Sequence, residues 1–338
     1  MKAVQISRMG SYAGLEIVDR PQPVAGHGEA LVRVHATSLN YRDLLLPRGL
    51  LPGYGDCTGR IPLSDGAGEV IAVGPGVRRV NVGDRVACNA LPHWVAGDMR
   101  AECLAGSLGF IADGTLAEFA SFNADALVKL PDYLSYAEAA SLPCAALSAW
   151  NCLMEGRTSL RAGESVLVLG SGGVSLFALQ FAKTLGARVI ATTSSPTKAK
   201  RLVALGADAT IDYNLQPDWD AVVLELTAGK GVDRVVEVGG AGTFMRSANC
   251  TRVGGTLSCV GFVAGQQGGI DPLGLIRRAL SVNFYVMGSR VQFEAMLAAM
   301  VLHKLHPVID RTFDITQVAE AYSYLESGKH IGKVVITL

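Results

Sequence analysis

The sequence has no excess of charge of either sign. Lysine and arginine together number 30, as do aspartate and glutamate, and no basic run interrupts this balance. Nucleic-acid backbones and acidic membrane surfaces attract proteins through clustered positive charge. The even balance therefore argues against both as partners and is compatible with a small-molecule ligand.

Long apolar runs and paired cysteines are also missing. No stretch of about 18 apolar residues is free of charges and glycines, and the opening Met1 to Ile6 does not resemble a signal peptide. The seven cysteines are odd in number and include no Cys-x-x-Cys pair, so reduced thiols are expected. Together these absences predict a soluble, cytoplasmic protein.

What is present is an enzyme-sized chain that is rich in glycine. At about 150 residues for each domain, 338 residues predict two domains. Apolar residues make up 49% of the chain and charged residues 18%, which is enough to fill two cores. The 39 glycines exceed the roughly 24 expected from average usage. We therefore expect many tight turns or close backbone approaches.

The first 126 residues are rich in short β signals. β-Branched residues and apolar alternation mark five candidate strands. These are Lys2 to Ile6, Ala30 to Ala36, Glu69 to Val73, Arg85 to Asn89 and Leu116 to Phe122. Turn sequences such as Gly74-Pro75-Gly76 separate them. This pattern predicts a small irregular β barrel.

Farther along the chain, strand and helix signals alternate. Ser165 to Leu169 is an unbroken apolar run, which a parallel strand buried on both faces requires. Further candidate strands are Arg188 to Thr192, Asp233 to Val238 and Thr256 to Val260; candidate helices cover 175–185, 196–205 and 242–253. This alternation predicts a doubly wound parallel sheet. Two helices, near 293–303 and 316–327, and a strand at 333–338 are expected to follow.

A glycine turn directly follows the first buried strand. Gly170, Gly172, Gly173 and Val174 form it, and Ser175 stands where a third glycine is usual. Gly170 suits a tight turn, and Gly172 would let the backbone approach a pyrophosphate at the helix N-terminus. The alternative is a turn that needs glycine for its own geometry. The strand before and the helix after favour dinucleotide binding.

No carboxylate stands at the end of the second strand, where NAD sites usually hold the ribose 2′-hydroxyl. Thr193, Ser194, Ser195 and Lys198 occupy this region. Hydroxyls and a cation would bind a 2′-phosphate, which predicts NADP(H) as the cofactor. Alternatively, Ser195-Pro196 only starts the next helix. Both interpretations are compatible, because a capped helix start is itself an anion site.

Motifs along nearly the whole chain resemble the medium-chain dehydrogenase/reductase superfamily. They are Leu39 to Asp43, Ser64 to Val70 with Gly74, Val82 to Val86, Leu142-Pro143, Ser148 to Trp150, the glycine turn, Leu205 to Asp208 and Gly332 to Val335. The chain looks most like the zinc-independent, quinone oxidoreductase-like branch. The resemblance implies an α/β protein with a GroES-like β-rich catalytic domain, residues 1–126 completed by 288–338. Residues 127–287 would form a Rossmann dinucleotide-binding domain.

The resemblance also implies residues that bind the cofactor. Ser148 and the strand ends Val238-Gly239-Gly240 and Val260-Gly261-Phe262 are expected to line the nicotinamide and its ribose. Ser289 and Arg290 are expected to close over the cofactor, and Lys333 is a further candidate. For Gly239, Gly240 and Gly261 the alternative is ordinary turn chemistry at strand ends.

The metal ligands of zinc-dependent relatives are not matched. The corresponding positions hold Asn40, Ser64-Asp65 and Cys144, and one thiolate cannot build a three-ligand catalytic site. In place of the four cysteines of the structural zinc lobe, the chain offers Cys88 and Cys103. We expect no bound metal. Cys144 is either a small buried apolar side chain or a reactive thiol near the nicotinamide.

Asn40, Tyr41 and Asp43 are the candidate catalytic residues, because the family motif directs them at the active-site cleft. Hydride transfer to a carbonyl or activated alkene leaves negative charge on oxygen, which hydrogen-bond donors can stabilise. The alternative is that Asn40 caps a helix from Tyr41 to Leu46, with Asp43 in its first turn. The residues alone do not separate these roles.

These inferences predict an NADPH-dependent reductase of quinones, enones or related carbonyl compounds. Two alternatives stay open: a zinc-free alcohol dehydrogenase or aldehyde reductase, and a cofactor-binding protein with little turnover. The family also implies a homodimer, and the apolar segment Leu280 to Met287 is the candidate edge strand for pairing.

Overall fold

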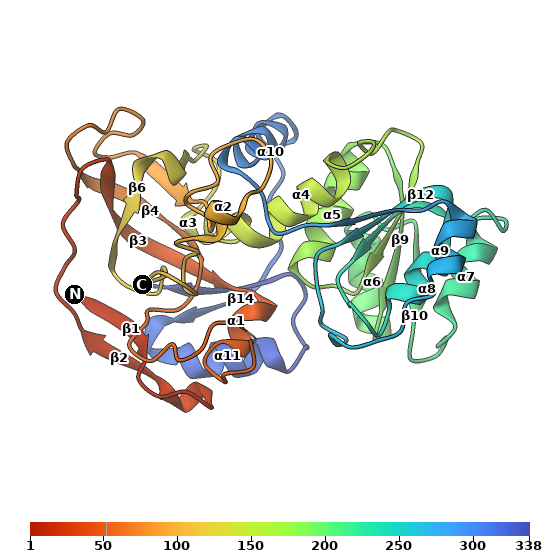
Figure 1. Ribbon diagram of the computed structural model, residues 1–338, viewed down its shortest axis with the longest axis horizontal. Coiled ribbons are helices and arrows are strands. Elements are labelled where there is room, and N and C mark those ends of the chain that lie inside the picture. The colour runs from red at the N-terminus through yellow and green to blue at the C-terminus, as the bar shows by residue number, and fades with distance from the viewer. Residues whose placement is uncertain (52) are drawn as a thin grey trace. The chain divides into compact units, whose positions relative to one another are not determined.

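A computed structural model describes residues 1–51 and 53–338 (Figure 1). The chain divides into two compact units: Met1–Leu147 with Gly288–Leu338, and Ser148–Met287. From the sequence, residues 127–147 are expected in the second of these units. They lie in the first unit because β7 (Leu127–Lys129) pairs with β5 (Arg85–Cys88). In addition, α3 (Tyr136–Ala140) packs against β3 (Glu29–Leu39).

The first unit contains a seven-stranded mixed sheet and a two-stranded ribbon. The larger sheet has the order β14-β15-β3-β4-β5-β7, and β6 also pairs with β3. Its other strands are β4 (Asp65–Val73), β6 (Phe119–Asn123), β14 (Ile309–Asp314) and β15 (Lys333–Thr337). β14 and β15 are parallel, and the other pairs are antiparallel. The ribbon joins β1 (Lys2–Ile6) to β2 (Leu15–Asp19).

Helices, all of them short except α10, fill the connections of the first unit. They are η1 (Tyr12–Gly14), α1 (Tyr41–Leu45), α2 (Ala101–Leu104), η2 (Ala124–Ala126), η3 (Leu142–Ala146), α10 (Arg290–His303), η4 (Ile315–Gln317) and α11 (Val318–Glu326). α4 (Leu147–Met154) begins at the last residue of the first segment. α1 packs against α11, so the residues that follow β3 are held by the C-terminal segment.

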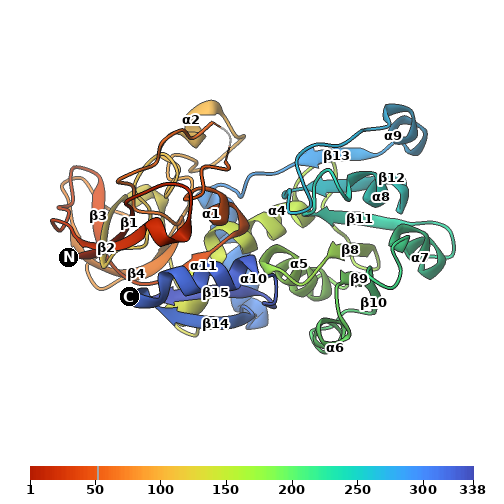
Figure 2. The same ribbon diagram turned by 90° about the horizontal axis from the view of Figure 1, so that it is seen from below.

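The second unit is a six-stranded, entirely parallel sheet. Its order is β10-β9-β8-β11-β12-β13, which Figure 2 shows from one edge to the other. The strands are β8 (Ser165–Leu169), β9 (Arg188–Thr193), β10 (Ala209–Asp212), β11 (Val232–Glu237), β12 (Thr251–Cys259) and β13 (Ser281–Phe284). In chain order this is 3-2-1-4-5-6, the Rossmann arrangement. The predicted α/β class and doubly wound sheet are confirmed.

The helices of this unit are α5 (Gly173–Thr184), α6 (Pro196–Ala204), α7 (Trp219–Leu226), α8 (Phe244–Asn249) and α9 (Pro272–Arg278). The prediction of a helix over 242–253 was wrong at its end. Thr251 already belongs to β12, where it pairs with Val232. β10 and α7 have no counterpart among the predicted elements.

Each unit has its own apolar core. In the first unit, one cluster packs β1 and β15 against α1 and α11, and another lies among β3 to β7. In the second, buried residues of β8, β9, β11 and β12 meet Trp219 of α7 and Phe244 of α8. Among the described residues, no helix has both the length and the apolar character needed to cross a membrane.

Candidate active site

Three neighbouring strands of the first unit bring Asn40, Asp65 and Lys333 together. Asn40 follows β3, whereas Asp65 begins β4 and Lys333 begins β15. Lys333 Nζ donates a hydrogen bond to Asn40 Oδ1 at 2.6 Å, and Asn40 Nδ2 donates to Asp65 Oδ2 at 3.0 Å. Lys333 Nζ also lies 3.5 Å from Asp65 Oδ2. We refer to these three residues as the Asn40 network.

The carboxylate of this network is fixed from several sides. The Asp65 side chain is wholly buried, and Ser38 Oγ donates to its Oδ2 at 3.1 Å. Thr115 Oγ1 donates to the Asp65 main-chain oxygen at 2.9 Å, and Thr37 Oγ1 donates to the same atom. Asp65 is therefore a rigid acceptor for the Asn40 amide.

Asp43 supports the start of α1. Its Oδ2 accepts the Asn40 backbone N–H at 2.7 Å, as in a capping box, and Asn40 is the N-cap residue of this helix. Within residues 1–51 and 53–338, Asp43 Oδ1 is buried without a hydrogen-bond partner. Burial raises the pKa of the Asp43 carboxyl to about 6, although Arg42 and the Asn40 N–H act in the opposite direction. Helix capping and the Asn40 network therefore coexist.

The positions that correspond to zinc ligands form no metal-ligand set. Ser64 Oγ accepts a hydrogen bond from Arg42 Nη2 at 2.6 Å, and the Asn40 amide is engaged by Lys333 and Asp65. Desolvation raises the pKa of the Cys144 thiol to about 12, so the thiolate is disfavoured. In the described part of the chain, no three His, Cys, Asp or Glu side chains gather closely enough to hold a metal. These residues do not fit a zinc ion, and two cations lie beside them.

Cys88 and Cys103, the other candidate thiols, are buried. Burial also raises the pKa of the Cys88 thiol. Tyr41 opens α1 and remains 37% exposed.

The glycine turn of the second unit connects β8 to α5. Gly170 has a φ of +75°, which favours glycine, whereas Gly172 is the N-cap of α5 with an ordinary φ of −75°. A Cβ atom at Gly172 would meet nothing within 4 Å. Ser175 Oγ donates to the Leu169 carbonyl oxygen at 2.6 Å, which ties the helix to the strand. Gly173 and Val174 form the first turn of α5.

The end of β9 holds the predicted 2′-phosphate residues in one segment. Ser195 caps α6, and its hydroxyl accepts the backbone N–H of Lys198 at 3.3 Å. Thr193 is buried, whereas Ser194 and Lys198 are partly exposed. The helix-start interpretation is therefore correct, and it leaves anion binding open.

Sequence reasoning missed the turn that follows β10. The Tyr213 N–H donates to the Thr193 carbonyl oxygen at 3.0 Å, and Asn214 Nδ2 donates to that of Ser194 at 2.8 Å. Asp212 is the register partner of Thr193, and its carboxylate accepts the Asn214 N–H at 3.0 Å. A carboxylate therefore stands on the neighbouring strand, although none stands on β9.

Glu237 organises the end of β11 and was not predicted. Its Oε1 accepts hydrogen bonds from the N–H groups of Gly239 and Gly240 at 2.7 and 2.9 Å, and from Thr243 Oγ1 at 2.6 Å. Its Oε2 accepts the Ser247 hydroxyl. The sequence signal that could have identified it is a carboxylate directly after the apolar residues Val235 and Val236, near the end of a predicted strand. The structure buries this carboxylate completely.

The glycines beside Glu237 are required by packing. A Cβ at Gly239 would lie 2.2 Å from Thr243 Oγ1, and one at Gly261 would lie 2.4 Å from the Val238 carbonyl oxygen. Gly240 has a φ of +80°. These contacts support the strand-end interpretation. Val238, Val260 and Phe262 are partly exposed beside them.

Four other predicted cofactor residues have defined places. Ser148 is buried in α4 of the second unit. Ser289 caps α10 and accepts the Gln292 N–H at 3.2 Å, and Arg290 pairs with Glu294 at 2.9 Å; both lie in the first unit. Lys333 is buried, and its ammonium is bound to Asn40, Asp65 and the Leu39 carbonyl oxygen.

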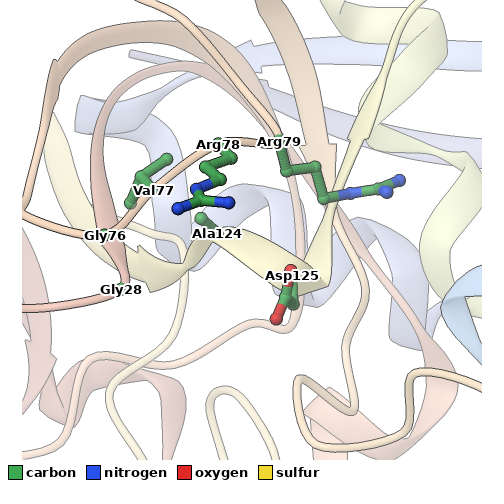
Figure 3. A pocket seen from close by; sticks show the side chains of 7 residues that line it. All are labelled: Gly28, Gly76, Val77, Arg78, Arg79, Ala124 and Asp125. Carbon is green, nitrogen blue, oxygen red and sulfur yellow. The ribbon is translucent and has the colours of Figure 1, made fainter.

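A groove of about 460 Å³ lies elsewhere in the first unit, along the turn at Gly76 to Arg79 (Figure 3). Arg78 lies over it, whereas the Arg79 guanidinium turns to the Leu127 carbonyl oxygen and to Glu294. None of the predicted site residues lines this groove.

Comparison with known proteins gives two family matches. Residues 26–132 match the alcohol dehydrogenase GroES-like domain, and residues 173–301 match the zinc-binding dehydrogenase family. The chain is 40% identical to a zinc-type alcohol dehydrogenase-like protein of Schizosaccharomyces pombe, covering 92% of this chain and 91% of that protein.

Two further proteins resemble the chain along its whole length. It is 32% identical to a quinone oxidoreductase of Pseudomonas aeruginosa, covering 99% of each chain. A solved NAD-dependent alcohol dehydrogenase is 35% identical, covers 100% of both chains and superposes with a TM-score of 0.89.

Proposed function

Because the chain belongs to the medium-chain dehydrogenase/reductase superfamily, we propose that it is an NADPH-dependent enzyme that reduces quinones, enones or related carbonyl compounds without a metal. The Asn40 network is the observation that carries this proposal. It places a polarised amide where zinc-dependent relatives hold a ligand, and the described residues offer no set of side chains that suits zinc.

The nicotinamide ring, when bound, supplies the hydride. Asn40 then donates a hydrogen bond to the substrate oxygen, on which negative charge develops. The proton that completes the reduction comes from water or from a side chain of the cleft. Asp65 accepts one N–H of the Asn40 side-chain amide. Among the described residues, no acceptor is found for the other N–H of that amide. Tyr41, which is partly exposed, is the second candidate donor, and Asp43 holds the start of α1 in place.

The substrate class follows from the strength of this stabilisation. In a quinone or enone, the charge left by hydride transfer spreads over a conjugated system, so hydrogen-bond donors can stabilise it. The localised alkoxide of a simple alcohol calls for a stronger electrophile, such as a metal. The network therefore favours conjugated acceptors, as does the resemblance to a quinone oxidoreductase.

Gly172 supports cofactor binding at the glycine turn. Its φ is ordinary and a Cβ there would have open space, so nothing within the chain explains a glycine. A pyrophosphate approaching the N-terminus of α5 does explain it. Ser194, Ser195 and Lys198 would bind the 2′-phosphate of NADPH, and the strand ends at Val238–Gly240 and Val260–Phe262 would line the nicotinamide.

Metal independence follows from the same residues. Lys333 donates to Asn40 Oδ1 and Arg42 donates to Ser64 Oγ, so the side-chain oxygens that a divalent cation would need already accept hydrogen bonds. Purified protein should carry less than one zinc per chain, and chelators should leave turnover unchanged. Stoichiometric zinc whose removal abolishes activity would contradict this assignment.

Steady-state oxidation of NADPH against a panel of quinones, enones and aldehydes tests the function. We expect the conjugated acceptors to have the highest kcat/KM. Asn40→Ala should lower kcat about a hundredfold with little change in NADPH affinity, and Tyr41→Phe should lower it less. A preference for aldehydes would indicate the alcohol dehydrogenase that two relatives suggest. NADPH binding without turnover would indicate a binding protein.

A further inference from the structure

The Asn40 amide lies between two buried groups of opposite charge. The Lys333 side chain is 3% exposed and the Asp65 side chain is fully buried. An ammonium only donates hydrogen bonds and a carboxylate only accepts them. Asn40 Oδ1 must therefore face Lys333, and Nδ2 must face Asp65, as the distances of 2.6 and 3.0 Å show.

Rotating the amide by 180° would reverse both contacts. Nδ2 would then face the ammonium and Oδ1 would face the carboxylate. Each buried charge would lose its hydrogen bond to Asn40, because the ammonium would meet a donor and the carboxylate would meet an acceptor. Neither charged group can move away to accommodate this. The Leu39 carbonyl oxygen holds the ammonium at 2.8 Å, and Ser38 Oγ holds the carboxylate at 3.1 Å.

We propose that Lys333 is a positioning residue that fixes the orientation of the Asn40 amide, so that an N–H rather than the carbonyl oxygen faces the substrate. This inference rests on the proposed function, in which Asn40 donates to the substrate oxygen. Lys333 touches neither substrate nor cofactor in this role. It acts through Asn40, and Asp65 is its counter-charge.

The test is a cycle of variants in the full-length protein. Lys333→Met alone would leave Asp65 buried without its cation, so the main variant combines Lys333→Met with Asp65→Asn and removes both charges. It is compared with Asn40→Ala and with the triple variant that carries all three substitutions. Val334→Ala, at the neighbouring buried position of β15, is the control for loosening the strand.

We call the variant with Lys333→Met and Asp65→Asn the charge-neutral variant. Its kcat should be at least tenfold lower than that of the unmodified protein, and its Kd for NADPH should lie within twofold. Adding Asn40→Ala to it should cause no loss beyond that of Asn40→Ala alone, because Lys333 acts through Asn40. The single variant Lys333→Arg, which keeps a cationic donor, should have a higher kcat than the charge-neutral variant. Val334→Ala should keep kcat per folded molecule.

A spectroscopic measurement needs no turnover. In ¹⁵N-labelled protein, the side-chain amide pair that disappears in Asn40→Ala should exchange with solvent faster in the charge-neutral variant than in the unmodified protein. Unchanged kcat and unchanged amide exchange in that variant would overturn the proposal. The proposal would also be overturned if the loss of kcat in the triple variant equalled the product of the losses in Asn40→Ala and in the charge-neutral variant. If Asn40→Ala itself keeps full turnover, the proposed function of this site fails, and the positioning role fails with it.

Discussion

Asp43 is the site residue whose protonation changes nearest to neutral pH. Burial of its carboxyl, reinforced by the charge of Asp65, raises its pKa from 3.8 to about 6, against the lowering effects of Arg42, the Asn40 N–H and Lys333. The folded protein therefore binds this proton more tightly than the unfolded chain does. The resulting stabilisation is complete below about pH 4 and is lost as the pH rises through about 6.

Asp43→Asn removes this titration and keeps an acceptor for the Asn40 N–H. The unfolding free energy of the variant minus that of the unmodified protein should rise by about 2 kcal/mol as the pH increases from 4.5 to 7.5. Urea unfolding at several pH values measures this. Asp19→Asn is the control, because Lys2 lowers the pKa of the exposed Asp19 carboxyl, which therefore stays ionised in the folded protein throughout this pH range. The effect of Asp19→Asn on stability should be nearly constant between pH 4.5 and 7.5. An equally constant effect of Asp43→Asn would contradict the assignment.

Local patterns could predict some of the site residues but not their partners. Asn40, Asp43 and the glycine turn are marked by motifs within a few positions. The bond between Lys333 and Asn40 joins residues 293 positions apart, and only the pairing of β15 with β3 brings them together. No local pattern contains that information, so Lys333 is predicted for the cofactor although the structure places it in the Asn40 network.

At the scale of elements, the end of β11 depends on one carboxylate. Glu237 accepts two N–H groups and two hydroxyl groups in a wholly buried position. Removing it leaves all four donors unsatisfied, so Glu237→Ala should lower the unfolding free energy by about 3–5 kcal/mol.

Urea unfolding would measure this loss, and fluorescence titration would measure NADPH affinity, which should fall because the Val238–Gly240 turn loosens. Glu237→Gln keeps one acceptor oxygen and should lose less of both. Glu225→Ala, at an exposed position of α7, is the matched control and should change little. Equal stability of Glu237→Ala and the control would refute the role of Glu237.

We predict that the N-terminus of α6 sets the cofactor preference. Lys198 and the hydroxyls of Ser194 and Ser195 favour a 2′-phosphate, whereas Asp212 on the neighbouring strand opposes it. One charge-assisted contact is worth about 1.5–3 kcal/mol, so NADPH should bind tenfold to a hundredfold more tightly than NADH.

Calorimetric titration with both cofactors tests this preference. Lys198→Ala should remove most of the difference, whereas Lys200→Ala, at an exposed position of the same helix, should preserve it. Tighter binding of NADH by the unmodified protein would show that Asp212 dominates the site.

Short elements could not be predicted as well as long ones. β10 has only four residues, Ala209 to Asp212, and an apolar-polar alternation over so short a stretch does not mark a strand. α8 ends at Asn249 because Thr251 pairs with Val232, and this tertiary contact outweighs the local helical pattern over 242–253. β8, in contrast, is an apolar run in the sequence and a central strand of the sheet.

For the whole molecule, the order of strands and helices could be predicted, whereas the exact division could not. The alternation after Ser165 predicts the parallel sheet because each such strand is buried on both faces. Residues 127–147 belong to the first unit through the pairing of β7 with β5, a contact over some forty positions that no local pattern reveals. The same limit applies to contacts between chains, which have to be argued from exposed surface.

The edge of the second unit's sheet is where we predict that two copies pair. β13 ends the strand order, and in the described chain it pairs with β12 alone. Its Phe284 is 76% exposed, and Leu273 and Ile276 of the adjoining α9 are exposed as well.

An unpaired apolar edge invites association, and a two-fold axis would place two β13 strands antiparallel. Light scattering should give twice the chain mass at micromolar concentration. Phe284→Lys should shift this to a single chain, because it would place a charge in the interface. Leu302→Lys, at an equally exposed position of α10, should leave the mass unchanged. A single-chain mass for the unmodified protein, or a dimer that persists in Phe284→Lys, would show that this edge does not hold two copies together.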